Sequence, residues 1–151
     1  MGIEIGPLHV RRSGFVAASP HRVWQECASH ERLAAWFGRG HALEHFEPTV
    51  GSDVRLSVDI DGDVARFGGR LIVFEAEREL TYESNWEGAD AWPVAMYHTI
   101  RLTPLYSGTL VELFHHGFER LGENAGTTLE DYEAGWTNRH LVALREIVEA
   151  A

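Results

Sequence analysis

Residues 127–148 read TTLEDYEAGWTNRHLVALREIV, and their apolar side chains have to be covered by the rest of the chain. Thr127 is followed three residues later by Glu130, which is the spacing of a capping box at the start of a helix. Apolar and aromatic side chains then recur at helical spacing: Leu129, Tyr132, Trp136, His140, Leu144 and Ile147. The pattern predicts one long C-terminal helix with an apolar stripe that another element must cover.

The residues before this helix predict a meander of antiparallel strands. Residues 53–61 alternate strictly between polar and apolar side chains, which is the period-2 pattern of a half-buried strand. Asp61-Gly62 is a tight-turn dipeptide, and Gly68-Gly69 predicts a bend or bulge in the strand that follows. The further strands are expected at residues 64–74, 79–86, 94–104 and 109–117.

A first strand and two short helices precede the meander. Residues 8–18 are rich in valine and phenylalanine, as a strand would be. Ser19 can cap a helix that begins with Pro20, and a second helical turn is expected from Glu31 to Trp36. The order of elements predicts an α+β fold in one domain over residues 1–151, with its core in residues 8–148.

The composition of the chain argues against several classes of binding partner. The chain has 13 Lys and Arg against 23 Asp and Glu, a formal net charge of −10, so we expect neither nucleic acid nor an anionic lipid surface as partner. Cys27 is the only cysteine, which excludes an intrachain disulfide and suits a reducing compartment; we expect it to be a buried apolar residue. The start, residues 1–7, lacks a signal-peptide pattern, and no apolar run approaches the roughly 20 residues that span a bilayer. We therefore expect a cytoplasmic protein without membrane insertion.

The same order of elements predicts a pocket. A strongly twisted sheet cannot follow a straight helix along its whole length, so side chains must fill the gap or leave a cavity. Tyr82, His98 and His115 are polar-tipped residues among inward-facing aliphatic ones, and Tyr132 and Trp136 face them from the helix. Such a lining is typical of a small-molecule site. It is equally typical of a filled core whose polar tips bond to backbone or buried water.

The candidate ligand-binding residues are the inward-facing positions of the predicted sheet and helices. They are Trp36, Phe46, Leu56, Val58, Leu71, Tyr82, Ser84, Trp86, Met96, His98, Ile100, Leu113, His115, Tyr132 and Trp136. Among them His98 and His115 are also candidates for an acid–base role, because histidine transfers protons near neutral pH. The tyrosines, Tyr82 and Tyr132, could donate a hydrogen bond to a ligand carbonyl.

A metal site is not expected. His41 and His45 are four residues apart, and His115 and His116 are adjacent. The four-residue spacing brings two ligands together on a helix, whereas residues 40–46 have the composition of a loop or strand. We expect no metal and no cofactor.

Several segments, in this order, resemble the START-like or SRPBCC superfamily, and most of all its branch named for the activator of the heat-shock chaperone ATPase. They are residues 18–24 (ASPHRVW), 33–37 (LAAWF), 47–51 (EPTVG), 115–118 (HHGF) and 132–136 (YEAGW). The resemblance covers residues 8–148. It implies a helix-grip architecture, in which a curved antiparallel sheet of about six or seven strands wraps around a long C-terminal helix, with two short helices after the first strand. It also implies a hydrophobic cavity, which members of the superfamily use for lipids, polyketides or plant hormones.

Two residues depart from the pattern of that branch. Ser84 stands where it often has a tryptophan, and His98 where it often has an aliphatic residue; both changes would enlarge the pocket or make it more polar. The eukaryotic co-chaperone that this domain resembles stimulates the ATPase with a separate N-terminal domain. No segment here is long enough for that domain, so we do not expect chaperone activation.

The sequence therefore favours binding of a small hydrophobic ligand, because it contains no recognisable catalytic set. One alternative is a cyclase-, aromatase- or hydrolase-like enzyme that uses a cavity histidine as acid–base. Another is a chaperone-related or regulatory module that binds a protein partner through its acidic surface. A monomer and a homodimer are both compatible with the pattern.

Overall fold

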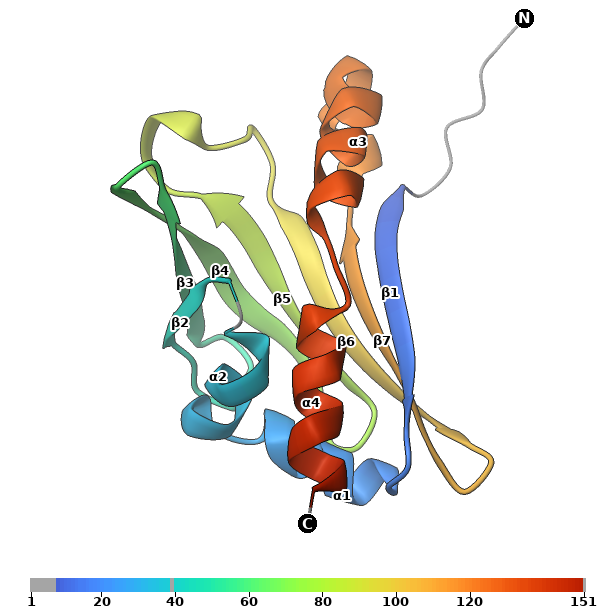
Figure 1. Ribbon diagram of the computed structural model, residues 1–151. Helices are drawn as coiled ribbons and strands as arrows, with labels where there is room; N and C mark the ends of the chain where they lie inside the picture. The colour runs from blue at the N-terminus through green and yellow to red at the C-terminus, as the bar shows by residue number, and fades with distance from the viewer. Residues whose placement is uncertain (1–7, 39, 151) are drawn as a thin grey trace, which may run out of the picture.

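The computed structural model describes residues 8–38 and 40–150, and its central element is a seven-stranded antiparallel sheet (Figure 1). The strands lie in the order β1-β7-β6-β5-β4-β3-β2. Their bounds are β1 His9–Val16, β2 Ala42–His45, β3 Asp53–Ile60, β4 Asp63–Glu75, β5 Glu79–Trp86, β6 Met96–Leu105 and β7 Gly108–His116. Consecutive strands from β2 to β7 are neighbours, so the meander is confirmed. Residues 1–7, for which no signal peptide is predicted, lie outside the described residues.

Helices cover one face of the sheet (Figure 1). The α-helices are α1 Pro20–Trp24, α2 His30–Phe37, α3 Ala125–Gly135 and α4 Arg139–Glu149, and short 3₁₀ turns are η1 Gln25–Cys27, η2 Gly88–Asp90 and η3 Phe118–Asn124. The Ser19 hydroxyl accepts a hydrogen bond from the Arg22 N–H, and Pro20 opens α1, as predicted. The α+β helix-grip fold is confirmed. Within the described residues, no helix combines the length and the apolar character needed to cross a membrane.

The C-terminal helical segment is divided in two, although its apolar spacing runs on without a break. It begins at Ala125, before Thr127, so the predicted capping box does not mark its start. It stops at Gly135, Trp136 has extended backbone angles of φ −78° and ψ 131°, and α4 begins after Asn138. Glycine and asparagine are poor helix formers, and a period of four residues is kept across the break. The spacing alone could therefore not reveal it.

Two apolar clusters fill the fold. The larger one lies between the sheet and the helices α1, α2 and α4. The smaller one consists of Val10, Met96 and Phe118, with Leu129 and Tyr132 of the α3 segment packed against them. Trp136 packs against both clusters. The break between α3 and α4 therefore places one large ring where the two clusters meet.

Gly68-Gly69, where a bend or a bulge is predicted, is not the site of a bulge. The register between β4 and β5 shifts between Leu71 and Val73, two residues later. Gly68 has a φ of +145°, and a Cβ there would collide with the backbone oxygen of Val54 on β3. These glycines let the backbones of neighbouring strands approach closely where the sheet bends.

We predict that Gly68→Ala lowers the free energy of unfolding by about 2–4 kcal/mol, because the methyl group meets backbone atoms that cannot move aside. Gly62→Ala is the matched control. Gly62 also has a positive φ, +89°, but open space around it. Gly62→Ala should therefore lower the free energy of unfolding by only about 1–2 kcal/mol. Urea denaturation of both variants measures the difference. Equal losses would show that backbone conformation, and not close approach, explains Gly68.

Candidate ligand-binding site

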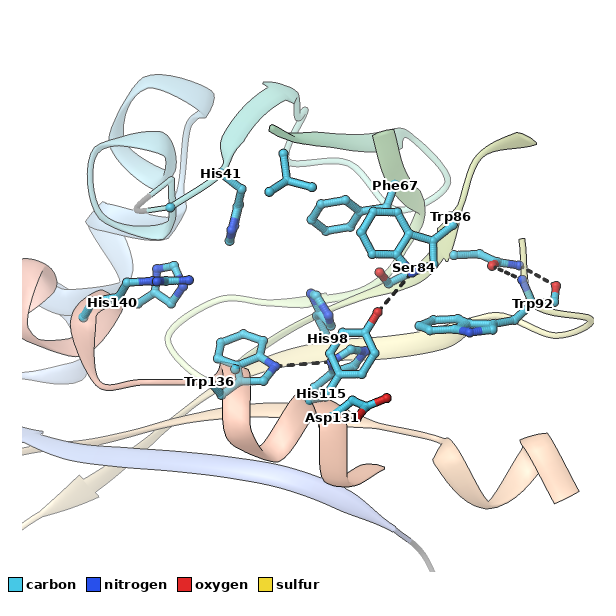
Figure 2. A pocket seen from close by; sticks show the side chains of 16 residues that line it. His41, Phe67, Ser84, Trp86, Trp92, His98, His115, Asp131, Trp136 and His140 are labelled. Atoms are coloured by element: carbon cyan, nitrogen blue, oxygen red, sulfur yellow. Dashed lines mark hydrogen bonds between the residues drawn. The ribbon is translucent and has the colours of Figure 1, made fainter. Parts of the chain in front are cut away.

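A cavity of about 370 Å³ lies between the middle of the sheet and the junction of α3 with α4 (Figure 2). Its volume is within the range of small-molecule pockets, which is roughly 300–1,000 Å³. Exposed residues mark its mouth, namely Gly40, Asp131, Gly135 and Arg139. Ser84, His98 and His115 are buried and form its deeper wall. The cavity is therefore a recess that reaches from the surface into the core.

The structure places part of the predicted set on the cavity wall. The predicted residues that line it are Val58, Ser84, Trp86, His98, His115, Tyr132 and Trp136. Those that lie in the packed clusters instead are Trp36, Phe46, Leu56, Leu71, Met96, Ile100 and Leu113. Tyr82 lies behind the wall, where its hydroxyl is 2.5 Å from Nδ1 of His98. That any of these residues binds a ligand stays a prediction.

Other lining residues were not predicted, and they are His41, Phe67, Asn85, Trp92 and His140, besides those at the mouth. Phe67 could have been found, because it pairs with Leu56 on β3 and with Trp86 on β5, both of which were predicted to face inward. His140 was in the helical stripe but was assigned to packing. His41 follows a loop, and no periodic pattern covers it.

Trp92 reaches the cavity because a side chain holds its loop. The Asn85 amide donates to the Trp92 carbonyl oxygen at 3.0 Å and accepts from the Trp92 N–H at 2.8 Å (Figure 2). Both ends of the amide are thus used to fix the segment after β5. The Trp92 ring then lies 5.8 Å from that of Tyr132, and the Phe67 and Trp86 rings are 5.0 Å apart. Aromatic rings therefore form much of the wall.

Four histidines border the cavity: His41, His98, His115 and His140. Burial lowers the pKa of His98 well below its usual value and that of His115 to about 3. Burial likewise lowers the pKa of His41 and of His140 to about 4, helped at both by the charge of Arg139. All four imidazoles are therefore neutral at pH 7. A catalytic acid or base works best when its pKa lies near the working pH, so the lowered pKa values weaken the acid–base role considered for His98 and His115.

Two further hydrogen bonds connect the wall residues. The Trp136 Nε1–H donates to Nδ1 of His115 at 3.3 Å (Figure 2). The Trp86 Nε1–H donates to the Tyr132 hydroxyl oxygen at 3.0 Å. In contrast, Nε2 of His41, His98 and His115 is buried without a hydrogen-bond partner. The wall therefore holds polar atoms that the protein itself does not satisfy.

The described residues contain no group of three or more metal-binding side chains. His41 borders the cavity, but His45 is exposed at the end of β2. His115 and His116 point to opposite faces of β7, and His116 bonds to Thr99 at 2.8 Å. Cys27 is buried as predicted, and burial raises the pKa of its thiol to about 12, so it is not a nucleophile.

Comparisons with known proteins agree with this architecture. The model of a family described as "Activator of Hsp90 ATPase homolog 1-like protein" matches residues 17–149. None of the curated protein sequences matches the chain.

Solved structures share the fold at low sequence identity. A protein from Chromobacterium violaceum is 23% identical with a TM-score of 0.69, over 93% of this chain and 96% of that chain. A protein from Nitrosomonas europaea is 18% identical with a TM-score of 0.70, over 95% of each chain. The Aha1 dimer of Colwellia psychrerythraea is 12% identical with a TM-score of 0.60, over 94% of this chain and 96% of that chain. At these identities the similarity establishes the fold alone.

The lowered histidine pKa values predict how stability depends on pH. In the unfolded chain these imidazoles take up protons near pH 6.5, whereas in the folded chain they do so only near pH 4 or below. The unfolded state therefore binds more protons as the pH falls, and the free energy of unfolding decreases. We expect it to be constant above about pH 7 and to fall between about pH 6.5 and 5, by up to about 1.4 kcal/mol per pH unit for each proton.

Urea denaturation at a series of pH values checks this expectation. His115→Gln should reduce the proton uptake on unfolding at pH 5 by about one. A profile that is flat from pH 7 to 5 would contradict the neutral, buried state of the cavity histidines.

Proposed function

We propose that this chain, which belongs to the activator of Hsp90 ATPase homolog 1-like family, binds a small and largely apolar molecule in the cavity at the α3–α4 junction. The observation that carries the proposal is a recess of about 370 Å³ with a mainly aromatic wall, which reaches inward to the buried residues Ser84, His98 and His115. A recess of this volume, with an apolar wall and a few polar groups, has the usual character of a small-molecule site.

The wall can supply the affinity that such binding needs. Removal of apolar ligand surface from water contributes about 25 cal/mol per Å². The rings of Phe67, Trp86, Trp92 and Trp136 present flat apolar faces that need little rearrangement to contact a ligand. Their fixed positions reduce the entropy lost on binding. The proposal therefore favours a compact ligand with aromatic or alicyclic character.

The mouth has the opposite character. Asp131 and Arg139 are exposed and border it with charges of opposite sign. Any side chain at Gly40 would collide with the Arg139 guanidinium, so the glycine leaves room for that group at the rim. The charged groups therefore lie at the exposed mouth, and the aromatic rings line the recess behind it.

The chemistry of the wall supports binding over catalysis. The four imidazoles are neutral at pH 7, because burial lowers their pKa values. Ser84 has no hydrogen bond to a histidine in the described part of the chain, so the wall lacks a nucleophile paired with a base. Binding does not need either feature.

Filling the cavity tests the proposal. We predict that Ser84→Leu reduces the affinity for the uncharged fluorophore N-phenyl-1-naphthylamine at least about tenfold, because the larger side chain occupies the deep wall. The protein should remain folded, because Ser84 borders the cavity and the added carbon atoms have room there. Fluorescence titration measures the affinity, because emission of this probe rises in apolar surroundings.

Thr103→Leu is the matched control, because it adds the same apolar side chain at an exposed position of β6. It should bind the probe as the parent protein does. Undiminished binding by Ser84→Leu would move the site away from this cavity. No binding by the parent protein would leave the proposed function without support.

A further inference from the structure

The direction of the hydrogen bonds in the wall indicates what kind of polar atom a ligand brings. An indole N–H can only donate, so in the bond between Trp86 and Tyr132 the tyrosine oxygen is the acceptor. The Tyr132 O–H remains a donor, and residues 8–38 and 40–150 offer it no acceptor. Tyr132 is a lining residue. The cavity therefore contains one hydroxyl proton that the protein leaves unused.

The same reasoning applies to His115. The Trp136 indole donates to Nδ1 of His115, so Nδ1 must be the unprotonated nitrogen of the ring. A neutral imidazole carries one N–H, which then lies on Nε2. Nε2 of His115 is buried without a partner. It is a second unused donor, and the His115 ring is 4.7 Å from that of Tyr132.

His98 provides a third unused hydrogen-bond donor. If its Nδ1 donated to Tyr82, the buried Tyr82 proton and the Nε2 lone pair of His98 would both be left without partners. If Tyr82 donates to Nδ1 instead, only the Nε2–H of His98 is unsatisfied. The second arrangement leaves fewer buried groups unpaired and is favoured. The His98 ring lies 4.2 Å from that of His115, so the unused donors are neighbours.

We infer that the ligand of this cavity carries a neutral carbonyl oxygen, which accepts hydrogen bonds from the Tyr132 O–H and from the Nε2–H of His115, with His98 as the adjacent donor. The inference rests on the proposed function and adds the polar group of the ligand to it. More than nine in ten buried polar groups in proteins are paired, so adjacent unpaired donors in one wall call for an acceptor from outside. The carbonyl oxygen offers two lone pairs and no proton, which matches this set.

Other polar groups match it less well. An amine or ammonium would place further donors against donors. A carboxylate would be buried beside imidazoles that carry no charge, and the guanidinium of Arg139 lies at the exposed mouth. The donor character is local: the His140 Nδ1–H donates to the Trp36 carbonyl oxygen, so its Nε2 is an acceptor. His140 and His41 lie apart from His98 and His115 in Figure 2.

The three donors lie at different depths in the cavity, so a ligand oxygen does not meet them all at once. Nε2 of His98 and of His115 has no contact with water, whereas Tyr132 is only half-buried. The oxygen therefore meets Tyr132 first. The imidazole donors lie deeper, so contact with them requires movement of the side chains that pack around His98 and His115.

Three probes of nearly equal size test the inference: 1-tetralone, its parent hydrocarbon tetralin, and 1-aminotetralin. Titration calorimetry and displacement of N-phenyl-1-naphthylamine give their affinities. We expect 1-tetralone to bind about tenfold more tightly than tetralin, and 1-aminotetralin to bind most weakly. Equal affinities for 1-tetralone and tetralin would overturn the inference and leave the proposed function intact. No binding of any probe would overturn both.

Tyr132→Phe removes one donor and keeps the ring. It should lower the affinity for 1-tetralone about tenfold and leave the affinity for tetralin nearly unchanged. Tyr106→Phe, at an exposed turn, should change neither affinity. Equal losses for both probes would assign Tyr132 a structural role and overturn the inference. The comparison of probes in the unaltered protein stands even if the variant unfolds.

Nuclear magnetic resonance adds an independent readout. The indole N–H groups of Trp86 and Trp136 donate to Tyr132 and His115, so an oxygen that accepts from these residues polarises both bonds. We expect 1-tetralone to shift both indole resonances more than tetralin does. Identical shifts with the two probes would contradict the inference.

Discussion

The position of Trp136 is the constraint on which the site depends. Its ring packs against both apolar clusters, so it connects the core under α4 with the core under α3. It can do so because the chain is extended at this residue, between the end of α3 at Gly135 and the start of α4 at Arg139. The indole N–H then reaches His115 on β7. The extended backbone at Trp136 therefore accounts both for the break between the helices and for the bond between Trp136 and His115.

Burial of the wall has two effects that act together. It keeps the imidazoles neutral, because a charged ring would lose its hydration, and their pKa values fall accordingly. A neutral imidazole has one donor and one acceptor, and the wall uses the acceptor of His115 for Trp136. The remaining donor has no partner. The same desolvation that removes the positive charge therefore leaves a directional polar group beside an apolar surface.

Much of the fold could be predicted from local patterns. The strict alternation of residues 53–61 identified β3, and Ser19 with Pro20 identified the start of α1. The site was less accessible to such reasoning. Periodicity tells which face of a strand is buried, but it does not distinguish a residue that lines a cavity from one that is fully packed. Leu56 and Val58 share a face of β3, yet only Val58 borders the cavity.

Residue order and spacing alone determined the antiparallel meander, the helical C-terminal segment and the set of side chains that turn inward, because each follows from short-range periodicity and from the need to bury apolar surface. Tertiary structure decided where these inward-facing side chains leave a cavity between them. The bond of Trp136 to His115, the approach of His41 to His140 and the pairing of Trp86 with Tyr132 all join residues far apart in the chain. No local pattern encodes such meetings, since they depend on how the bent sheet and two separate helices pack around one another.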